Sequence, residues 1–180
     1  MIEVEVKARI DNIDEIKQKL NSLNAKFLKQ ETQMDKIFGN PIFLDSNNKI
    51  IEGGIVSRIR VVNDTKILEF KEIMRTSGGI EIESELSSID DGIALLKKLG
   101  FEEAFTVSKV RETYSYNDFT ICLDKVEKLG CFIEVEKKIS SNEEKNKQKE
   151  ECIKLLNLIS PGCKIENRKY GDLMQEIINK

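Results

Sequence analysis

Charged and apolar residues alternate along several short stretches of this sequence, and the alternation limits the fold more than any other feature. The clearest stretch is residues 2–7, which run in the order Ile2, Glu3, Val4, Glu5, Val6 and Lys7. Because successive side chains of a β-strand point to opposite faces, this order predicts a strand with one apolar face and one charged face.

The same spacing returns in five later stretches, each of which again places charged side chains on one strand face. These are Arg58 with Arg60, Glu69 with Lys71, Glu81 with Glu83 and Glu85, Lys109 with Arg111, and Glu134 with Glu136. We expect strands at residues 1–10, 42–44, 55–62, 66–72, 80–86, 107–116, 119–124 and 132–138, and residues 26–38 are expected to be extended. Short turns such as Asn117-Asp118 favour antiparallel hairpins between them.

Four other stretches have the period of a helix. They are residues 13–23, residues 91–99, a long stretch ending at residue 159 that Ser141 and Glu144 open as a capping box, and residues 170–179. Each has one apolar stripe, which suits packing outside a curved sheet. We therefore predict a single α+β domain over residues 1–180, in which about eight strands close into an antiparallel β-barrel with a charged tunnel and the helices pack outside.

The alternative is that the charged faces point to solvent and carry no function. The apolar faces, however, need the helices as cover, so closing the sheet puts the charged faces inside the barrel. Unpaired charges there are costly, unless acids pair with bases or a polyanion and metal ions occupy the space. We favour this charged interior over a solvated face.

The sequence contains no histidine, which excludes histidine zinc sites, Ser-His-Asp triads and histidine general bases. Any metal must be held by oxygen ligands, which favour Mg²⁺ or Mn²⁺. The four cysteines, at 122, 131, 152 and 163, lack metal-site spacing and are expected to be reduced and mostly buried. The net charge of -3 indicates neither nucleic acid nor membrane as a partner. Without an evident signal region or membrane span, cytoplasmic residence is expected.

The order of the charged stretches resembles the CYTH superfamily of triphosphate tunnel metalloenzymes, over essentially the whole chain. The resemblance is carried by Glu3-x-Glu5-x-Lys7, Arg58-x-Arg60, Lys71, Glu83, Lys109-x-Arg111, Asp124, Glu134-x-Glu136 and Tyr170. Residues 42–45, 100–114 and 168–170 are most similar to class IV adenylyl cyclases. The resemblance implies an enzyme that acts on a triphosphate with Mg²⁺ or Mn²⁺.

The candidate site residues form two chemical groups. The basic group suits phosphate oxygens and comprises Lys7, Arg58, Arg60, Lys71, Lys109 and Arg111. The acidic group suits a divalent metal and comprises Glu3, Glu5, Glu83, Asp124, Glu134 and Glu136. Lys7, Arg111 and Glu134 are the catalytic candidates. Participation of Glu81, Glu85 and Tyr170 is left open, Glu69 is interpreted as a partner of Lys71, and Asp35 and Asp45 are interpreted as turn residues.

The favoured function is that of a class IV-type adenylyl cyclase, which converts ATP to cyclic AMP and pyrophosphate. The alternative is hydrolysis by an inorganic triphosphatase, a thiamine triphosphatase or a nucleoside triphosphatase, because the same charged lining serves either reaction. A non-catalytic nucleotide- or polyphosphate-binding module ranks third, because such a module would not need the acidic group. The sequence leaves open whether the chain forms a homodimer.

Overall fold

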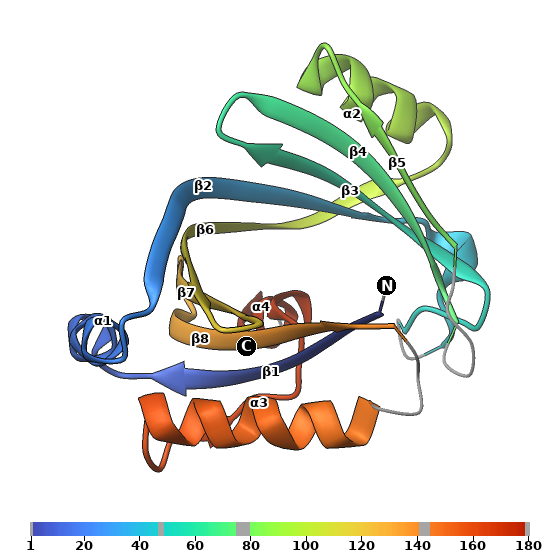
Figure 1. The fold of residues 1–180 in the computed structure, drawn as a ribbon. Coiled ribbons are helices and arrows are strands. Elements are labelled where there is room, and N and C mark those ends of the chain that lie inside the picture. Colours follow the sequence, from blue (N-terminus) through green and yellow to red (C-terminus); the bar gives the residue numbers. More distant parts are fainter. Residues whose placement is uncertain (1, 47–48, 75–79, 141–144, 179–180) are drawn as a thin grey trace. The chain divides into compact units, whose positions relative to one another are not determined.

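The protein is described by a computed structural model that covers residues 2–46, 49–74, 80–140 and 145–178 (Figure 1). In chain order its elements are β1 (Ile2–Ile10), α1 (Ile13–Ser22), β2 (Lys26–Gly39), the short 3₁₀ helix η1 (Pro41–Phe43), β3 (Gly54–Val62), β4 (Thr65–Ile73), β5 (Glu81–Glu85), α2 (Ile89–Lys98), β6 (Glu102–Tyr116), β7 (Phe119–Val126), β8 (Gly130–Ile139), α3 (Lys145–Ile159), β9 (Lys164–Ile165) and α4 (Tyr170–Ile178). The predicted α+β class is confirmed.

The strands form a large sheet in the order β5-β4-β3-β2-β6-β7-β8-β1-β9. Neighbouring strands are antiparallel in the pairs β2–β3, β3–β4, β4–β5, β6–β7, β7–β8, β8–β1 and β1–β9. In the described residues no hydrogen-bonded pair joins the end strands β5 and β9, so hydrogen bonds do not close this sheet into the expected barrel. The confirmed part of that expectation is the large antiparallel sheet.

The chain forms two compact units. Unit 1 consists of Met1–Glu31 and Lys109–Lys180, and unit 2 consists of Thr32–Ser108. Strands β2 and β6 each contribute residues to both units. The expectation of one domain over residues 1–180 stays a prediction.

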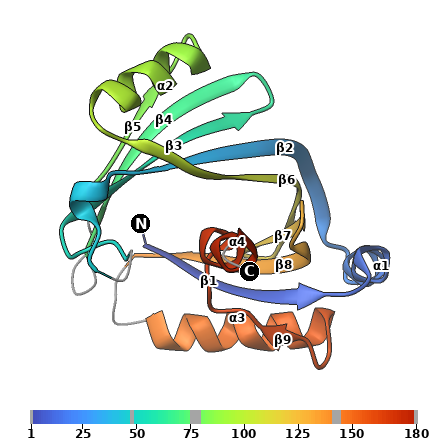
Figure 2. The same ribbon diagram turned by 180° about the vertical axis from the view of Figure 1, so that it is seen from behind.

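In unit 1 the apolar sheet face is covered by α1 and α3. Strand residues of this face, such as Ala8, Ile121 and Ile133, pack with Leu20 of α1 and Leu156 of α3 in one buried cluster. Figure 2 shows α3 running along β1, and contacts join α3 to both β1 and β8. Full burial of a large apolar side chain contributes about 1.5–3 kcal/mol, so this cluster fixes which face of the sheet is left for the charged residues.

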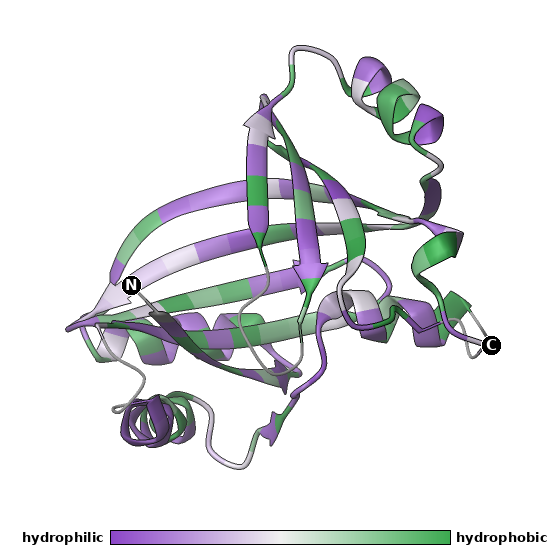
Figure 3. Cartoon of the chain, turned by 90° about the vertical axis from the view of Figure 1, so that its right-hand side faces the viewer, coloured by the Kyte–Doolittle hydropathy of each residue, from purple (hydrophilic) through white to green (hydrophobic). Residues whose placement is uncertain are grey.

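In unit 2 helix α2 covers the apolar face of β3 and β4. Phe38, Ile59, Leu68 and Leu96 are buried there with Phe101. A side chain at Gly92 of α2 would meet Ile59 at 3.2 Å and Leu86 at 2.6 Å, so the glycine permits a close approach of helix and sheet. The alternation along the strands is visible in Figure 3 as green and purple bands.

The helix ends follow the residues that the sequence offers as caps. The Asn12 side chain accepts a hydrogen bond from the backbone nitrogen of Asp14 at 3.0 Å, and Ser88 accepts one from that of Asp91 at 3.3 Å. Gly100 follows α2 with a φ of +83°, the left-handed conformation that glycine adopts at low cost. The capping box predicted for α3, Ser141 with Glu144, lies outside the described residues.

Three elements differ from expectation. The strand predicted at residues 42–44 is wrong: Pro41 opens the 3₁₀ helix η1, and the Asn40 side chain caps it. Strand β6 starts at Glu102, five residues before the expected start at Val107. The two-residue strand β9 was not expected, because only its pairing with β1 defines it. Within the described residues, none of the helices combines the length and apolar character needed to span a membrane.

Candidate functional site

The charged face of unit 1 lies on β6, β7, β8 and β1, opposite the face covered by helices. The register places Lys7 beside Glu134, Glu5 beside Glu136, and Arg111 beside Asp124. Directly opposed residues of an antiparallel pair share a face, so the sequence-predicted residues Glu3, Glu5, Lys7, Lys109, Arg111, Asp124, Glu134 and Glu136 are all brought to this one sheet face.

Asp124 is the centre of this face. It is 0% exposed and accepts hydrogen bonds from Lys109 Nζ at 3.1 Å, from Arg111 Nε at 2.7 Å and Nη2 at 2.5 Å, and from the Tyr170 hydroxyl at 2.8 Å. Burial by itself would raise the pKa of Asp124, but the Arg111 hydrogen bonds and the Lys109 charge lower it overall. Four donors use most of the lone pairs of the carboxylate, which suits a residue that positions cations better than a metal ligand.

Arg111 joins Asp124 to Glu134. Its Nη2 also donates to Glu134 Oε2 in a short contact, and Lys7 Nζ lies 3.9 Å from Glu134 Oε1. Burial would lower the pKa of Arg111, but the hydrogen bond to Asp124 and the charges of both carboxylates raise it. The pKa of Lys109 is lowered, chiefly by burial, with Asp124 opposing the shift. Positive charge is thus held at the buried positions of this face.

Carboxylates gather beside these cations. The pKa of Glu5 is raised by desolvation and by the charge of Glu134, although the residue as a whole is exposed. The pKa of Glu136 is raised by desolvation and by the charge of Glu3. Glu3 also pairs with Lys138 at 3.3 Å. A cation bound beside Glu5 and Glu136 would relieve the repulsion between these neighbouring carboxylates.

Tyr170, from the first turn of α4, completes the unit 1 face. Besides its bond to Asp124, its ring lies 4.3 Å from Lys7 Nζ and 5.0 Å from Lys109 Nζ, measured to the ring centroid. The ring also meets Phe132 edge-on, at 5.0 Å between centroids. The structure therefore brings Tyr170, whose participation the sequence left open, into the group of charged residues.

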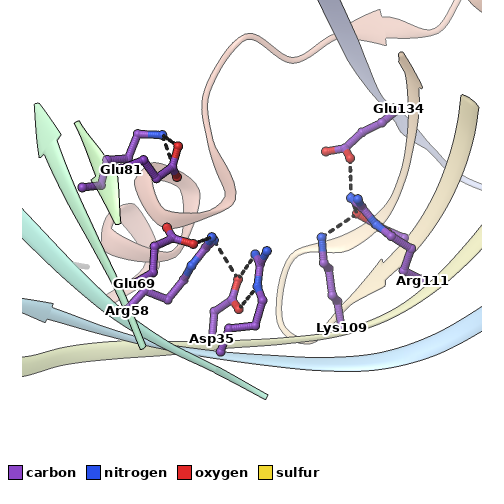
Figure 4. Close-up of polar contacts among 10 residues, drawn as sticks. Asp35, Arg58, Glu69, Glu81, Lys109, Arg111 and Glu134 are labelled. Carbon is purple, nitrogen blue, oxygen red and sulfur yellow. Dashed lines mark hydrogen bonds and ion pairs between the residues drawn. The ribbon is translucent and has the colours of Figure 1, made fainter. Parts of the chain in front are cut away.

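The charged face of unit 2 is a series of ion pairs across β2, β3, β4 and β5 (Figure 4). Asp35 accepts hydrogen bonds from Arg60 Nε and Nη2 at 2.7 and 2.8 Å and from Arg58 Nη1 at 3.3 Å. Arg58 Nη2 makes a short contact with Glu69, and Lys71 Nζ lies 3.3 Å from Glu81. The three predicted basic residues of unit 2 thus share one face, each beside a carboxylate.

The acidic strand β5 is exposed along its length. The register sets Glu83 opposite Glu69 and Glu81 opposite Lys71. Glu83, Glu81 and Glu85 therefore belong to the same face as the arginines, on a strand at the end of the sheet order.

Two residues of the unit 2 face were misread in the sequence. Asp35 was interpreted as a turn residue, which is wrong, since it lies in the middle of β2, is 8% exposed and holds two arginines. Glu69 was interpreted as a partner of Lys71, but it pairs with Arg58 instead. The signal for Asp35 was an acidic residue at an alternating position, two after Gln33, inside a long extended stretch.

Among the described residues, no three carboxylate or thiol side chains converge closely enough to hold a metal ion alone. The donor set is nevertheless of the type that Mg²⁺ uses, because this ion is commonly bound by one or two carboxylates and completed by substrate phosphates and water. Glu5 and Glu136, opposed in the register and both with raised pKa, fit such a role. The cysteines are free thiols, with Cys122 and Cys152 buried.

Comparison with known proteins identifies the family of the chain. A family model described as "CYTH domain" matches residues 1–162. A protein of Methanocaldococcus jannaschii named "Putative adenylate cyclase MJ0240" is 34% identical over 165 residues, covering 89% of this chain and 90% of that protein. The PH1819 protein of Pyrococcus horikoshii has a similar structure, with a TM-score of 0.76, 29% identity, and coverage of 98% of this chain and 99% of that chain.

A more distant structure shares the fold alone. It is the Hippeastrum protein HpAC1, a putative adenylyl cyclase described as having a dominant triphosphatase activity, with a TM-score of 0.68 and 17% identity over 97% of this chain and 96% of that one. The family match includes the charged strands of both units, and the M. jannaschii relative is similar over most of the same length. The chain therefore belongs to the CYTH domain family.

Proposed function

We propose that this protein is a metal-dependent enzyme that acts on a triphosphate substrate, most simply as a class IV-type adenylyl cyclase. The observation that carries the proposal is the unit 1 face, where Lys7, Lys109 and Arg111 lie together beside the mutually repelling carboxylates Glu5 and Glu136. A triphosphate with a bound divalent ion complements such a face. Its phosphate oxygens would pair with the cations, and its metal ion would pair with the carboxylates.

The basic residues would bind and orient the phosphate chain. Arg111 is fixed by Asp124 and Glu134, so its remaining guanidinium N–H groups point in a set direction before substrate arrives. Lys7 and Lys109 bring two ammonium groups to the same face. Preorganised donors of this kind stabilise charge that develops on phosphate oxygens without further rearrangement.

The acidic residues would hold Mg²⁺ or Mn²⁺. Glu5 and Glu136 are the primary candidates, with Glu3 and Glu134 beside them in the register. The ion would neutralise phosphate charge and lower the pKa of an attacking hydroxyl group, so the reaction would need no histidine base. We assign Asp124 to positioning, in place of the metal role that its sequence position suggested, because four donors already surround it.

In the cyclase reaction the ribose 3′-oxygen attacks the α-phosphorus of ATP and pyrophosphate leaves. The name of the M. jannaschii relative supports this choice. The second candidate is a triphosphatase, in which water attacks the terminal phosphorus. The presence of both Glu134 and Glu136 on one strand is compatible with either reaction and slightly favours that candidate.

We further propose that Arg58 and Arg60 of unit 2 bind phosphate, as expected from the sequence. The placement of those arginines on a single sheet face supports the proposal. The cytoplasmic location expected from the sequence is also part of the proposal.

The test is incubation with ATP, thiamine triphosphate and tripolyphosphate under Mg²⁺ and Mn²⁺, with separation of the products. A cyclase yields cyclic AMP and pyrophosphate from ATP, whereas a triphosphatase yields orthophosphate. Glu134→Gln should lose most of the activity with the fold intact. The matched control is Glu151→Gln, since Glu151 pairs with Lys137 and belongs to α3. Full turnover in excess chelator contradicts the metal-dependent reaction.

A further inference from the structure

We infer that Tyr170 is a positioning residue that orients Lys7 and Lys109 for phosphate with its aromatic face, and that the segment 164–170 belongs to the site for this reason. The inference rests on the proposed function and assigns to it a residue outside the part of the chain that the family model matches, residues 1–162.

The ring of Tyr170 lies beside both ammonium groups of the unit 1 face. Lys7 Nζ and Lys109 Nζ are 4.3 and 5.0 Å from its centroid, within the range in which an aromatic face attracts a cation. Both lysines are nearly buried, at 7% and 8% exposure, so water screens the attraction little. One ring therefore fixes the position of two cations.

A ring is a different partner from a carboxylate. Each lysine also has one carboxylate within ion-pair distance, Glu134 for Lys7 and Asp124 for Lys109. A second carboxylate in place of the ring would cancel more of the positive charge and would repel a phosphate chain. The neutral ring holds the ammonium groups and leaves their charge available for phosphate, which is the property that a binding site for a polyanion requires.

The ring itself is fixed from several sides. Its hydroxyl donates to Asp124 Oδ2 at 2.8 Å, and Phe132 packs against it edge-on. Burial, together with the nearby charges of Glu134 and Asp124, raises the pKa of the Tyr170 hydroxyl, so it stays a donor at neutral pH. Tyr170 therefore cannot swing away without breaking a buried hydrogen bond.

The chain that precedes Tyr170 is tied to the strand that carries Lys7. Strand β9 pairs with β1, Ile165 opposite Ala8, and the backbone nitrogen of Glu166 donates to the carbonyl of Lys7 itself at 2.7 Å. The Glu166 side chain lies 3.6 Å from Arg9 Nε and accepts hydrogen bonds from Arg168. These contacts explain how a residue far along the chain reaches the β1 lysine.

The test compares Tyr170→Phe with Tyr170→Leu. Phenylalanine keeps the ring and loses only the hydroxyl, whereas leucine removes the ring. Tripolyphosphate binding is measured by calorimetry without metal, so that only the basic residues contribute. We expect Tyr170→Phe to bind within about threefold of the unchanged protein and Tyr170→Leu to bind about tenfold more weakly, the size of a desolvated cation–π contact. Tyr116→Leu, on the helix-facing side of β6, is the matched control and should bind normally.

A second measurement is independent of any substrate. In protein labelled with ¹³C-lysine, the side-chain resonances of Lys7 and Lys109 should show the upfield ring-current shift of a group over an aromatic face. The shift should persist in Tyr170→Phe and disappear in Tyr170→Leu, with circular dichroism confirming the fold. Unshifted lysines in the unchanged protein overturn the geometry. If the unchanged protein binds tripolyphosphate and folded Tyr170→Leu binds equally well, the inference alone is wrong. If the unchanged protein binds no triphosphate, the proposed function is wrong as well.

Discussion

The two charged faces use the same residue types in different ways. In unit 1, Lys109 and Arg111 converge on one carboxylate, Asp124, that is 0% exposed. In unit 2, Lys71 and Glu81 form a pair whose side chains are 41% and 45% exposed. A buried shared carboxylate fixes its cations in advance, whereas solvated pairs exchange partners easily. We conclude that Asp124 holds its cations in fixed positions and that Lys71 of unit 2 is adjustable, whereas Arg58 and Arg60, held by the nearly buried Asp35, lie between these two cases.

The largest expected effect tests the buried centre of unit 1. Asp124→Asn removes the charge that Arg111 and Lys109 share, and loss of one partner of a buried ion pair typically costs about 3–5 kcal/mol. We expect a loss of this size in the free energy of unfolding, measured by urea denaturation. The control is Asp118→Asn, since Asp118 pairs with Lys137 but is well exposed and should cost less than about 1 kcal/mol. Equal losses in the two variants contradict the special role given to the buried Asp124.

The next effect tests the division between phosphate and metal residues. Arg60→Ala should weaken triphosphate binding without metal by about 1.5–3 kcal/mol, the value of a charge-assisted hydrogen-bond set. Glu5→Gln should instead act through the metal, so raising Mg²⁺ or Mn²⁺ should partly restore activity. The activity of both variants is measured as a function of metal concentration at fixed substrate, which separates the two roles. If the two curves shift alike, the assignment of roles is wrong.

A smaller effect, of opposite sign, tests whether the unit 2 arginines are adjustable. Asp35 holds both Arg58 and Arg60, so a phosphate chain must compete with its carboxylate. Asp35→Asn should therefore raise the affinity for tripolyphosphate by about threefold to tenfold, since one hydrogen-bonded partner of about 1 kcal/mol no longer competes. Calorimetry in the absence of metal measures this affinity. Weaker binding by a folded Asp35→Asn protein shows that the carboxylate aligns the arginines instead of competing for them.

The smallest effect concerns the repelling carboxylates. The pKa of Glu136 is raised in the folded protein, so its contribution to stability is present below the ordinary glutamate pKa of 4.5 and is lost as the pH rises through the folded value. Glu136→Gln removes this penalty and should raise the metal-free unfolding midpoint at pH 7 by about 1–2 °C. The gain should vanish at pH 4 and in saturating Mg²⁺, as followed by thermal denaturation. A gain that is independent of pH contradicts the electrostatic cause.

The sequence predicted the sheet faces well because they depend on local alternation. Glu5, Lys7, Arg111 and Glu134 all lie on the face that a period of two assigns to them. Alternation says which face a side chain takes, but it does not say which partner it finds. The pairing of Glu69 with Arg58 in place of Lys71 depends on strand register, which a single sequence does not specify.

The contacts of Asp35 and Tyr170 could not be derived from the sequence for a related reason. Asp35 lies in a stretch read as extended, and its importance comes from β3, which follows it by about twenty residues and supplies both arginines. Tyr170 enters the site through β9, whose two residues are too few for any periodic signal. Non-local pairing, which sequence periodicity does not report, created both features.

The strand pairing of unit 1 has a consequence for protein synthesis. The first strand, β1, pairs with β8, so Ile2 lies opposite Ile139, and residues 32–108 emerge from the ribosome between them. Unit 2 is contiguous and can fold while β1 still lacks its neighbour, because its contacts are closer together in the chain. During that interval the apolar residues Val4 and Val6 have no sheet partner, and the nascent chain must keep them from aggregation until β8 is made.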